Sequence, residues 1–90
     1  MPKRVFKYKL SKRATTKIEL PVGAQPLHVN IQDGEVYLWA LLDEKLLTSK
    51  FITILVLGTG HEINHPNHRY INTFLVNGGE NAFHAFEVFD

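Results

Sequence analysis

The chain has 90 residues, of which 44% are apolar, and a formal net charge of +1. This length predicts a single domain over residues 1–90, and the apolar fraction argues against a disordered chain. The absence of cysteine excludes a disulfide scaffold, a thiolate metal site and a cysteine nucleophile, and it is typical of a reducing cytoplasm. The small net charge argues against general binding of nucleic acid, so we do not expect nucleic acid as a partner. We expect neither a signal peptide nor membrane contact, because no apolar run is long enough to cross a bilayer.

Basic residues concentrate at the start of the chain, where seven of the ten lie between residues 3 and 17. Such a stretch within a strand is typical of a solvated face or a guarded edge strand. A phosphate-binding surface is the alternative interpretation.

Alternation of apolar and polar residues predicts strands along most of the chain. The expected strands cover residues 5–10, 16–20, 27–32, 35–42, 51–57, 70–77 and 81–89. Seven strands joined by tight turns leave no room for crossover helices. The sequence therefore predicts an all-β fold, either a small antiparallel sandwich or a barrel of about seven strands.

Two connections and two strands add detail to this prediction. Asp33-Gly34 between two apolar alternations indicates a type I′ hairpin, because both residues tolerate positive φ. The polar segment 43–49 is compatible with a turn of helix. The strands expected over 35–42 and 51–57 are apolar on both faces, which indicates central strands or strands covered by a partner. An exposed Tyr-Trp-Leu face on the first of them favours a homo-oligomer.

The longest irregular segment is expected over Gly58–Arg69, and it contains the literal pattern H-E-x-x-H from His61 to His65. That pattern supports zinc hydrolysis only on a helix, where both histidines share one face. Pro66 disfavours helical geometry at the second histidine, so a metalloprotease is disfavoured. A non-catalytic metal site formed with His68 is an open alternative to a plain polar loop, and we expect no metal and no cofactor.

Several residues are candidates for binding a small ligand. The Gly58–Gly60 turn follows a buried strand and could offer backbone N–H groups to a phosphate, or it is simply a tight turn. Trp39 can stack on a ring, with the core or a subunit interface as the alternative. His84 is typical of a packed histidine with one satisfied nitrogen, or it hydrogen-bonds a ligand. Together the candidate ligand-binding residues are Trp39, Gly58, Thr59, Gly60, His61, Arg69 and His84.

The order of short segments along nearly the whole chain carries a family resemblance. These segments are Lys7-Tyr8, Leu20-Pro21 with Gly23-Ala24, Leu38-Trp39-Ala40-Leu41, Gly58-Thr59-Gly60-His61, Tyr70-Ile71 with Thr73-Phe74, Gly78-Gly79, and Phe83-His84 with Phe86-Glu87. Their order resembles a family of small uncharacterised phage and prophage proteins. The resemblance implies a location in the cytoplasm of an infected bacterium and brings no catalytic residues. In that family proline often follows the GTGH segment, where this chain has Glu62, which implies that H-E-x-x-H is accidental here.

No serine–histidine–acid set has a persuasive spacing, and no paired acids indicate general acid–base chemistry, so we do not expect an enzyme. The sequence favours a non-enzymatic binding protein that counteracts a host defence or regulatory process. One version sequesters a small anionic, nucleotide-like ligand in pockets between subunits. The alternatives are a protein–protein inhibitor or accessory module that docks on a host protein, a structural or virion-associated domain, and a metal-dependent hydrolase.

Overall fold

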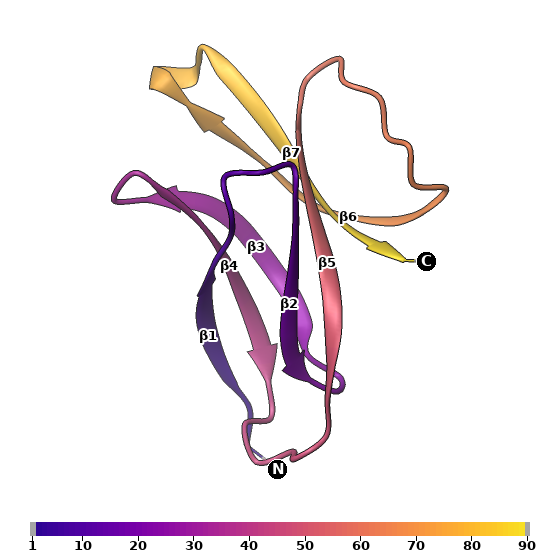
Figure 1. Ribbon diagram of the computed structural model, residues 1–90. Helices are drawn as coiled ribbons and strands as arrows, with labels where there is room; N and C mark the ends of the chain where they lie inside the picture. The colour runs from indigo at the N-terminus through magenta and orange to yellow at the C-terminus, as the bar shows by residue number, and fades with distance from the viewer. Residues whose placement is uncertain (1, 90) are drawn as a thin grey trace.

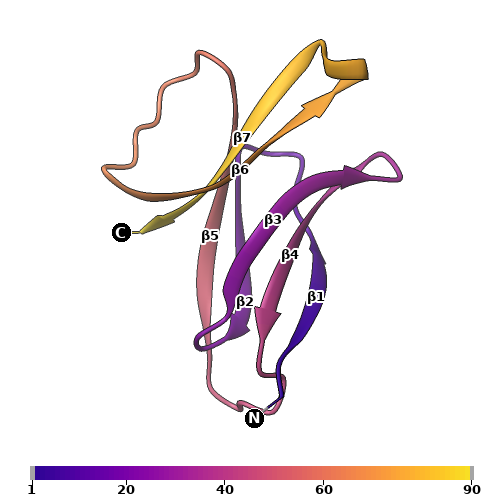
Figure 2. The same ribbon diagram turned by 180° about the vertical axis from the view of Figure 1, so that it is seen from behind.

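Two antiparallel sheets face each other in the computed structural model, which describes residues 2–89 (Figures 1 and 2). The seven strands of these residues are β1 (Arg4–Lys9), β2 (Thr15–Pro21), β3 (Gln25–Gln32), β4 (Glu35–Leu42), β5 (Ser49–Gly58), β6 (Asn67–Val76) and β7 (Asn81–Phe89). One sheet has the order β1-β4-β3 and the other the order β2-β5-β7-β6. The expected all-β sandwich is confirmed, and within the described residues the sheets do not close into a barrel.

The core lies between the two sheets. Its largest fully buried side chains are Leu20, Leu38, Ile54 and Val29, which come from β2, β4, β5 and β3. The two strands with apolar residues on both faces, β4 and β5, each lie between two other strands, which confirms their predicted central positions. The basic strand β1 is an edge strand, as its charges indicated.

Tight turns join the hairpins where glycine and its neighbour accept positive φ. At the β3–β4 turn, Asp33 has φ 53° and Gly34 has φ 79°, which confirms the expected type I′ hairpin. The β6–β7 connection is the 3-10 turn η1 (Asn77–Gly79), in which Asn77 also has a positive φ of 53°.

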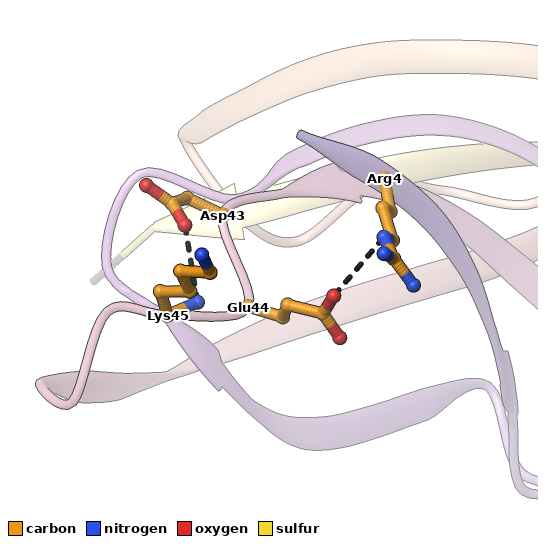
Figure 3. A network of polar contacts seen from close by, with 4 residues as sticks. All are labelled: Arg4, Asp43, Glu44 and Lys45. Atoms are coloured by element: carbon orange, nitrogen blue, oxygen red, sulfur yellow. Dashed lines mark hydrogen bonds and ion pairs between the residues drawn. The ribbon is translucent and has the colours of Figure 1, made fainter. Parts of the chain in front are cut away.

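The β4–β5 connection forms a turn in place of the helical turn that its composition allowed. The Leu46 N–H donates to the Asp43 carbonyl over 3.2 Å, and the Asp43 carboxylate accepts the Lys45 N–H over 3.0 Å. Because this carboxylate satisfies the backbone locally, the segment does not need helical hydrogen bonds. Arg4 Nε lies 3.1 Å from Glu44 Oε1 and ties the start of β1 to this connection (Figure 3).

The segment between β5 and β6 is shorter than expected, because β6 already begins at Asn67. His68 and Arg69, which were expected in the loop, lie on that strand. Strands β5 and β6 both pair antiparallel with β7, so they run parallel to each other and residues 59–66 must cross β7. Figure 1 shows this crossover segment as a wide arc that leaves the end of β5 and returns at the start of β6.

A side chain joins the two sheets along one edge of the sandwich. The β6 register shifts between Tyr70 and Asn72, so Tyr70 lies on the outer face and Asn72 on the inner face. There the Asn72 side chain reaches β3 and bonds the backbone of Val29. Within residues 2–89, no helix has the length and apolar character needed to span a membrane.

Candidate functional site

A cavity of about 530 Å³ opens at one end of the sandwich, where the β3–β4 turn and the β6–β7 turn lie on the same side of the molecule (Figure 1). Its inner wall is made by apolar side chains that continue the core: Leu10, Ile31, Val36, Val56, Phe74 and Phe83. Ile31 shares the inner face of β3 with Val29, yet it is 41% exposed. This end of the core is therefore unfilled and open to solvent.

The mouth of the cavity is basic. Lys12 and Arg13 line it from the β1–β2 connection, and His61 lines it from the crossover segment. Among the described residues neither Lys12 nor Arg13 has an ion-pair partner. The acidic residue at the mouth, Glu35, has its carboxylate 3.8 Å from Lys9 Nζ. An apolar interior with free cations at its entrance suits a ligand with a flat or apolar part and an anionic part.

Local hydrogen bonds fix the connection that carries the two cations. The Ser11 N–H donates to Thr16 Oγ1 over 2.9 Å, and the Ser11 hydroxyl donates to the Thr15 carbonyl over 3.2 Å. The Arg13 N–H donates to the Ser11 hydroxyl over 3.2 Å. The Val56 N–H donates to the Ala14 carbonyl over 2.8 Å and holds the connection beside β5. Lys12 and Arg13 therefore project from an ordered turn next to the Gly58–His61 turn.

The Gly58–His61 turn lies between two cavities. The His61 N–H donates to the Gly58 carbonyl over 3.2 Å, and the Thr59 N–H donates to the Ala82 carbonyl over 3.3 Å. These two N–H groups are thus already used within the protein, which weakens the phosphate cradle expected from the turn backbone. The His61 imidazole packs beside Gly58, whose added Cβ would lie 3.7 Å from His61 Cε1.

A second, smaller cavity of about 140 Å³ lies on the outer face of the four-stranded sheet, beneath the crossover segment. It is lined by Leu57, Thr59, His61, Ile63, His84 and Phe86. Because Ile63 and Phe86 share this cavity, the crossover segment passes over the outer face of β7. His61 lines both cavities and forms part of the wall between them.

His84 is held by hydroxyl groups at both ring nitrogens. Thr59 Oγ1 lies 2.7 Å from Nε2, and Thr73 Oγ1 lies 2.9 Å from Nδ1. The Tyr70 hydroxyl extends the chain of hydrogen bonds, 2.8 Å from Thr73 Oγ1. The sequence indicated a packed histidine with one satisfied nitrogen, whereas both nitrogens have partners. Since hydroxyls donate and accept, this arrangement accommodates either neutral tautomer.

The histidine-rich segment does not form the geometry of a zinc protease. Residues 61–66 are not helical, so His61 and His65 do not share a helix face. His68 lies on β6, where its Nδ1 is 2.7 Å from the His65 carbonyl and its ring meets Phe86 edge-on at 5.4 Å. Within the part of the chain that the structure describes, no three histidine or acidic side chains lie close enough together to hold a metal ion.

The structure brings together five of the seven candidate ligand-binding residues and places two elsewhere. Gly58, Thr59, Gly60, His61 and His84 line one or both cavities. Trp39 instead lies on the outer face of the three-stranded sheet, because its neighbours Leu38 and Ala40 occupy the core. Arg69 lies on β6 with its guanidinium 5.4 Å from the Phe89 ring.

Lys12 and Arg13 are the site residues that the sequence did not single out. Both were recognised as part of the basic first stretch, but nothing local connects them to a turn more than forty residues away. The connection lies beside that turn only because β2 pairs with β5.

A family model described as "Domain of unknown function (DUF7352)" matches residues 1–90. No curated protein and no solved structure matches the chain. The geometry of the site therefore carries the functional argument.

Proposed function

The chain belongs to the DUF7352 family over its whole length, and from the geometry of its open cavity we propose that it is a non-enzymatic binding protein that sequesters a small anionic ligand, in the first instance a nucleotide. The observation that carries this proposal is the 530 Å³ cavity with an apolar wall and, at its mouth, two cations that have no ion-pair partner within residues 2–89. Cavities of about 300–1,000 Å³ hold ligands of nucleotide size.

The cavity offers apolar contacts to a base and charged contacts to a phosphate at different places. The ring of a base packs against Ile31, Phe74 and Phe83 at the open end, where Ile31 is 41% exposed and Phe74 belongs to the buried core. Phosphate oxygens meet Lys12 and Arg13, because guanidinium and ammonium groups bind phosphate through charge-assisted hydrogen bonds. His61, which also lines the cavity, is proposed to orient the same anionic group. All of these residues belong to one chain, so we propose a site within the single chain in place of the pockets between subunits that the sequence suggested.

The resemblance to small phage and prophage proteins supports a biological setting for this activity. A protein that sequesters a nucleotide signal withdraws it from the host process that the signal controls. We therefore place the proposed activity in the cytoplasm of an infected bacterium, against a defence or regulatory process of the host.

Native mass spectrometry of the protein purified from a bacterial host, without added ligand, is the first test. A retained mass of nucleotide size supports the proposal. Thermal melting with a panel of linear and cyclic nucleotides then identifies the class, because ligand at a hundredfold excess over Kd stabilises the folded state by about 2.7 kcal/mol. For a domain of this size that corresponds to a rise in Tm of roughly 15 °C. Bare protein together with an unchanged Tm across the panel contradicts the proposal.

A matched pair of double variants locates the binding site. Lys12→Ala with Arg13→Ala should abolish the rise in Tm while leaving the melting temperature without ligand unchanged, because both side chains are exposed. Lys45→Ala with Lys50→Ala removes the same charge at exposed positions outside the cavity lining, and should preserve the rise. Equal effects of the two pairs would show that nucleotides bind elsewhere.

Docking on a host protein is a second candidate function, favoured by exposed apolar residues near the β4–β5 connection. Leu47 is 99% exposed and Phe51 is 61% exposed, and such residues are enriched in protein interfaces when they cluster. Affinity capture should then recover a stoichiometric host protein that is lost with Leu47→Asp. The control Leu75→Asp, at a 63% exposed position on β6, should retain it. Loss with both variants would contradict docking through this region.

A further inference from the structure

The outer face of the three-stranded sheet carries a row of aromatic rings. Tyr37 and Trp39 alternate along β4 with core residues, so both side chains lie on the outer face. His28 on β3 pairs with Trp39 across the strands. The Trp39 ring centroid is 6.2 Å from both the Tyr37 ring and the His28 ring, and Trp39 is only half-buried. The Tyr37 and His28 rings are tilted by 57° and 52° to the Trp39 ring, so a partly exposed aromatic row borders solvent on this sheet (Figure 2 shows its three strands side by side).

Lysine side chains of the edge strand β1 border this aromatic row. Lys7 pairs with Trp39 and Lys9 pairs with Tyr37. Lys7 Nζ lies 4.5 Å from the Tyr37 ring centroid and donates a hydrogen bond to Gln32 Oε1 over 2.8 Å. Its ammonium group thus extends across the sheet and lies on the aromatic surface itself, where an anion that contacts the rings also meets the charge.

The face carries a net positive charge. Strands β1, β3 and β4 contain a single acidic residue, Glu35, whose carboxylate is 3.8 Å from Lys9 Nζ. Among the described residues, Lys7 has no carboxylate partner. The net charge of +1 conceals this separation, because residues 3–17 contain seven basic residues and no acidic one. An occupant of this face must therefore bring negative charge.

A second copy of the chain does not supply that charge in the commonest arrangement. In an isologous pair the same face meets itself. Lys7 of each copy would then face a surface whose one carboxylate is already paired with Lys9. The aromatic residues favour an interface, but the lysine charges beside them oppose an interface between two copies of this same face.

We propose that this face binds single-stranded nucleic acid, with a base stacked on Trp39, one backbone phosphate at Lys7, and a second at Lys9 in exchange for its long 3.8 Å contact with Glu35. Partly exposed rings on a sheet bordered by cations are a combination by which proteins bind unpaired strands, since every base has a face that can stack. The proposal goes beyond nucleotide sequestration and is independent of it, because Lys12, Arg13 and His61 lie at the open cavity and not on this face.

The single tryptophan of the chain makes the test direct, because all tryptophan fluorescence comes from Trp39. The protein is titrated with an oligothymidylate of about 12 nucleotides, a typical site size for one small domain. Binding should quench the emission, and the affinity should fall steeply with salt because counterions are released from the phosphates.

Charge reversal at the face should weaken this binding. Lys7→Glu with Lys9→Glu should lower the affinity for the oligonucleotide about tenfold or more and flatten its salt dependence. Lys17→Glu reverses an exposed charge on β2 of the other sheet, and should change the affinity less than twofold, about the scatter of such titrations. The cavity variant Lys12→Ala with Arg13→Ala should bind the oligonucleotide as the unchanged protein does, so this proposal and the proposed function fail separately.

Loss of the ring separates stacking from charge. Trp39→Leu should lower the affinity about tenfold, measured by the anisotropy of a labelled oligonucleotide, while Trp39→Phe retains most of it. Thermal melting of each variant confirms that it is folded. The proposal is overturned if the oligonucleotide does not quench Trp39 in the unchanged protein and the lysine double variant binds it with unchanged affinity. It is also overturned if polyglutamate binds as tightly as the oligonucleotide. A dimer in which Trp39 is protected from quenching by iodide would overturn it as well.

Discussion

The Asn72 side chain bonds both backbone groups of Val29, accepting its N–H over 2.7 Å and donating to its carbonyl over 2.9 Å. The amide therefore adds a pair of hydrogen bonds between β6 and β3, which belong to different sheets. It satisfies backbone groups that are partly buried at the sandwich edge.

Removal of the Asn72 side-chain amide should destabilise the fold. Asn72→Ala leaves the N–H and carbonyl of Val29 without partners and should lower the free energy of unfolding by about 2 kcal/mol or more, measured by urea denaturation. Asn67→Ala, at an exposed position on the same strand, should change it by less than about 0.5 kcal/mol. Similar losses for both variants would show that the contact to Val29 contributes little.

The turn between the two cavities should depend on a glycine conformation. Gly60 has φ 91°, so Gly60→Ala forces a side chain into a left-handed region and should cost about 1–2 kcal/mol of unfolding free energy. Gly58 lacks a positive φ, and a Cβ there would make ordinary contacts at 3.7 Å or more. Gly58→Ala should therefore be tolerated, and a larger loss for Gly58→Ala than for Gly60→Ala in thermal melting would contradict this account.

The hydroxyl partners of His84 should anchor the crossover segment. Thr59→Val removes the bond to Nε2 and should cost about 1 kcal/mol of stability. It should also speed amide hydrogen exchange in residues 59–66, because Thr59 links this segment to β7. Thr73 lies on β6, and Thr73→Val breaks the bond to His84 Nδ1. This variant should cost similar stability but should leave amide exchange in residues 59–66 unchanged. If both variants leave exchange in residues 59–66 unchanged, the histidine does not anchor the segment.

Tyr8 should make the fold sensitive to high pH. Burial on the inner face of β1 raises the pKa of its phenol above the ordinary value of about 10, because the charged form loses hydration. Well below pH 10 the phenol is neutral in both states. Above it the unfolded chain loses the proton first, so the free energy of unfolding falls as the pH rises towards the folded pKa.

A conservative replacement isolates this contribution. In Tyr8→Phe the loss of stability above pH 10, measured by urea denaturation across pH 8–11 or so, should be smaller than in the unchanged protein. Tyr37→Phe, on the outer face of β4, should retain the full loss. Parallel curves for the unchanged protein and Tyr8→Phe would show that Tyr8 is not the group responsible.

The strands were predictable because alternation and turn chemistry are local properties. The β3–β4 hairpin follows from Asp33-Gly34 and its flanks, and the central place of β4 follows from its two apolar faces. The start of β6 was missed because Asn67, His68 and Arg69 are polar and show no alternation. They extend the strand through pairing with β7, and His68 also packs on Phe86, which is a tertiary effect.

The composition of the site was less predictable, because it depends on which strands share a sheet. The Gly58–His61 turn and His84 lie near each other since β5 and β7 are paired. Trp39 was grouped with them by chemistry alone, and the sheet order separates it from both cavities. Lys12 and Arg13 enter the site for the same reason, through the pairing of β2 with β5.

The position of β7 between β5 and β6 has a consequence for how the chain folds during translation. The ribosome releases β5 and β6 before the strand that must join them, so both expose unpaired edges until residues 81–89 emerge. The three-stranded sheet lacks this delay, since β1, β3 and β4 are all complete by residue 42. The nascent chain should therefore form that sheet first and complete the second sheet only when β7 inserts, which makes the interval between the emergence of β6 and that of β7 the period of greatest exposure to aggregation.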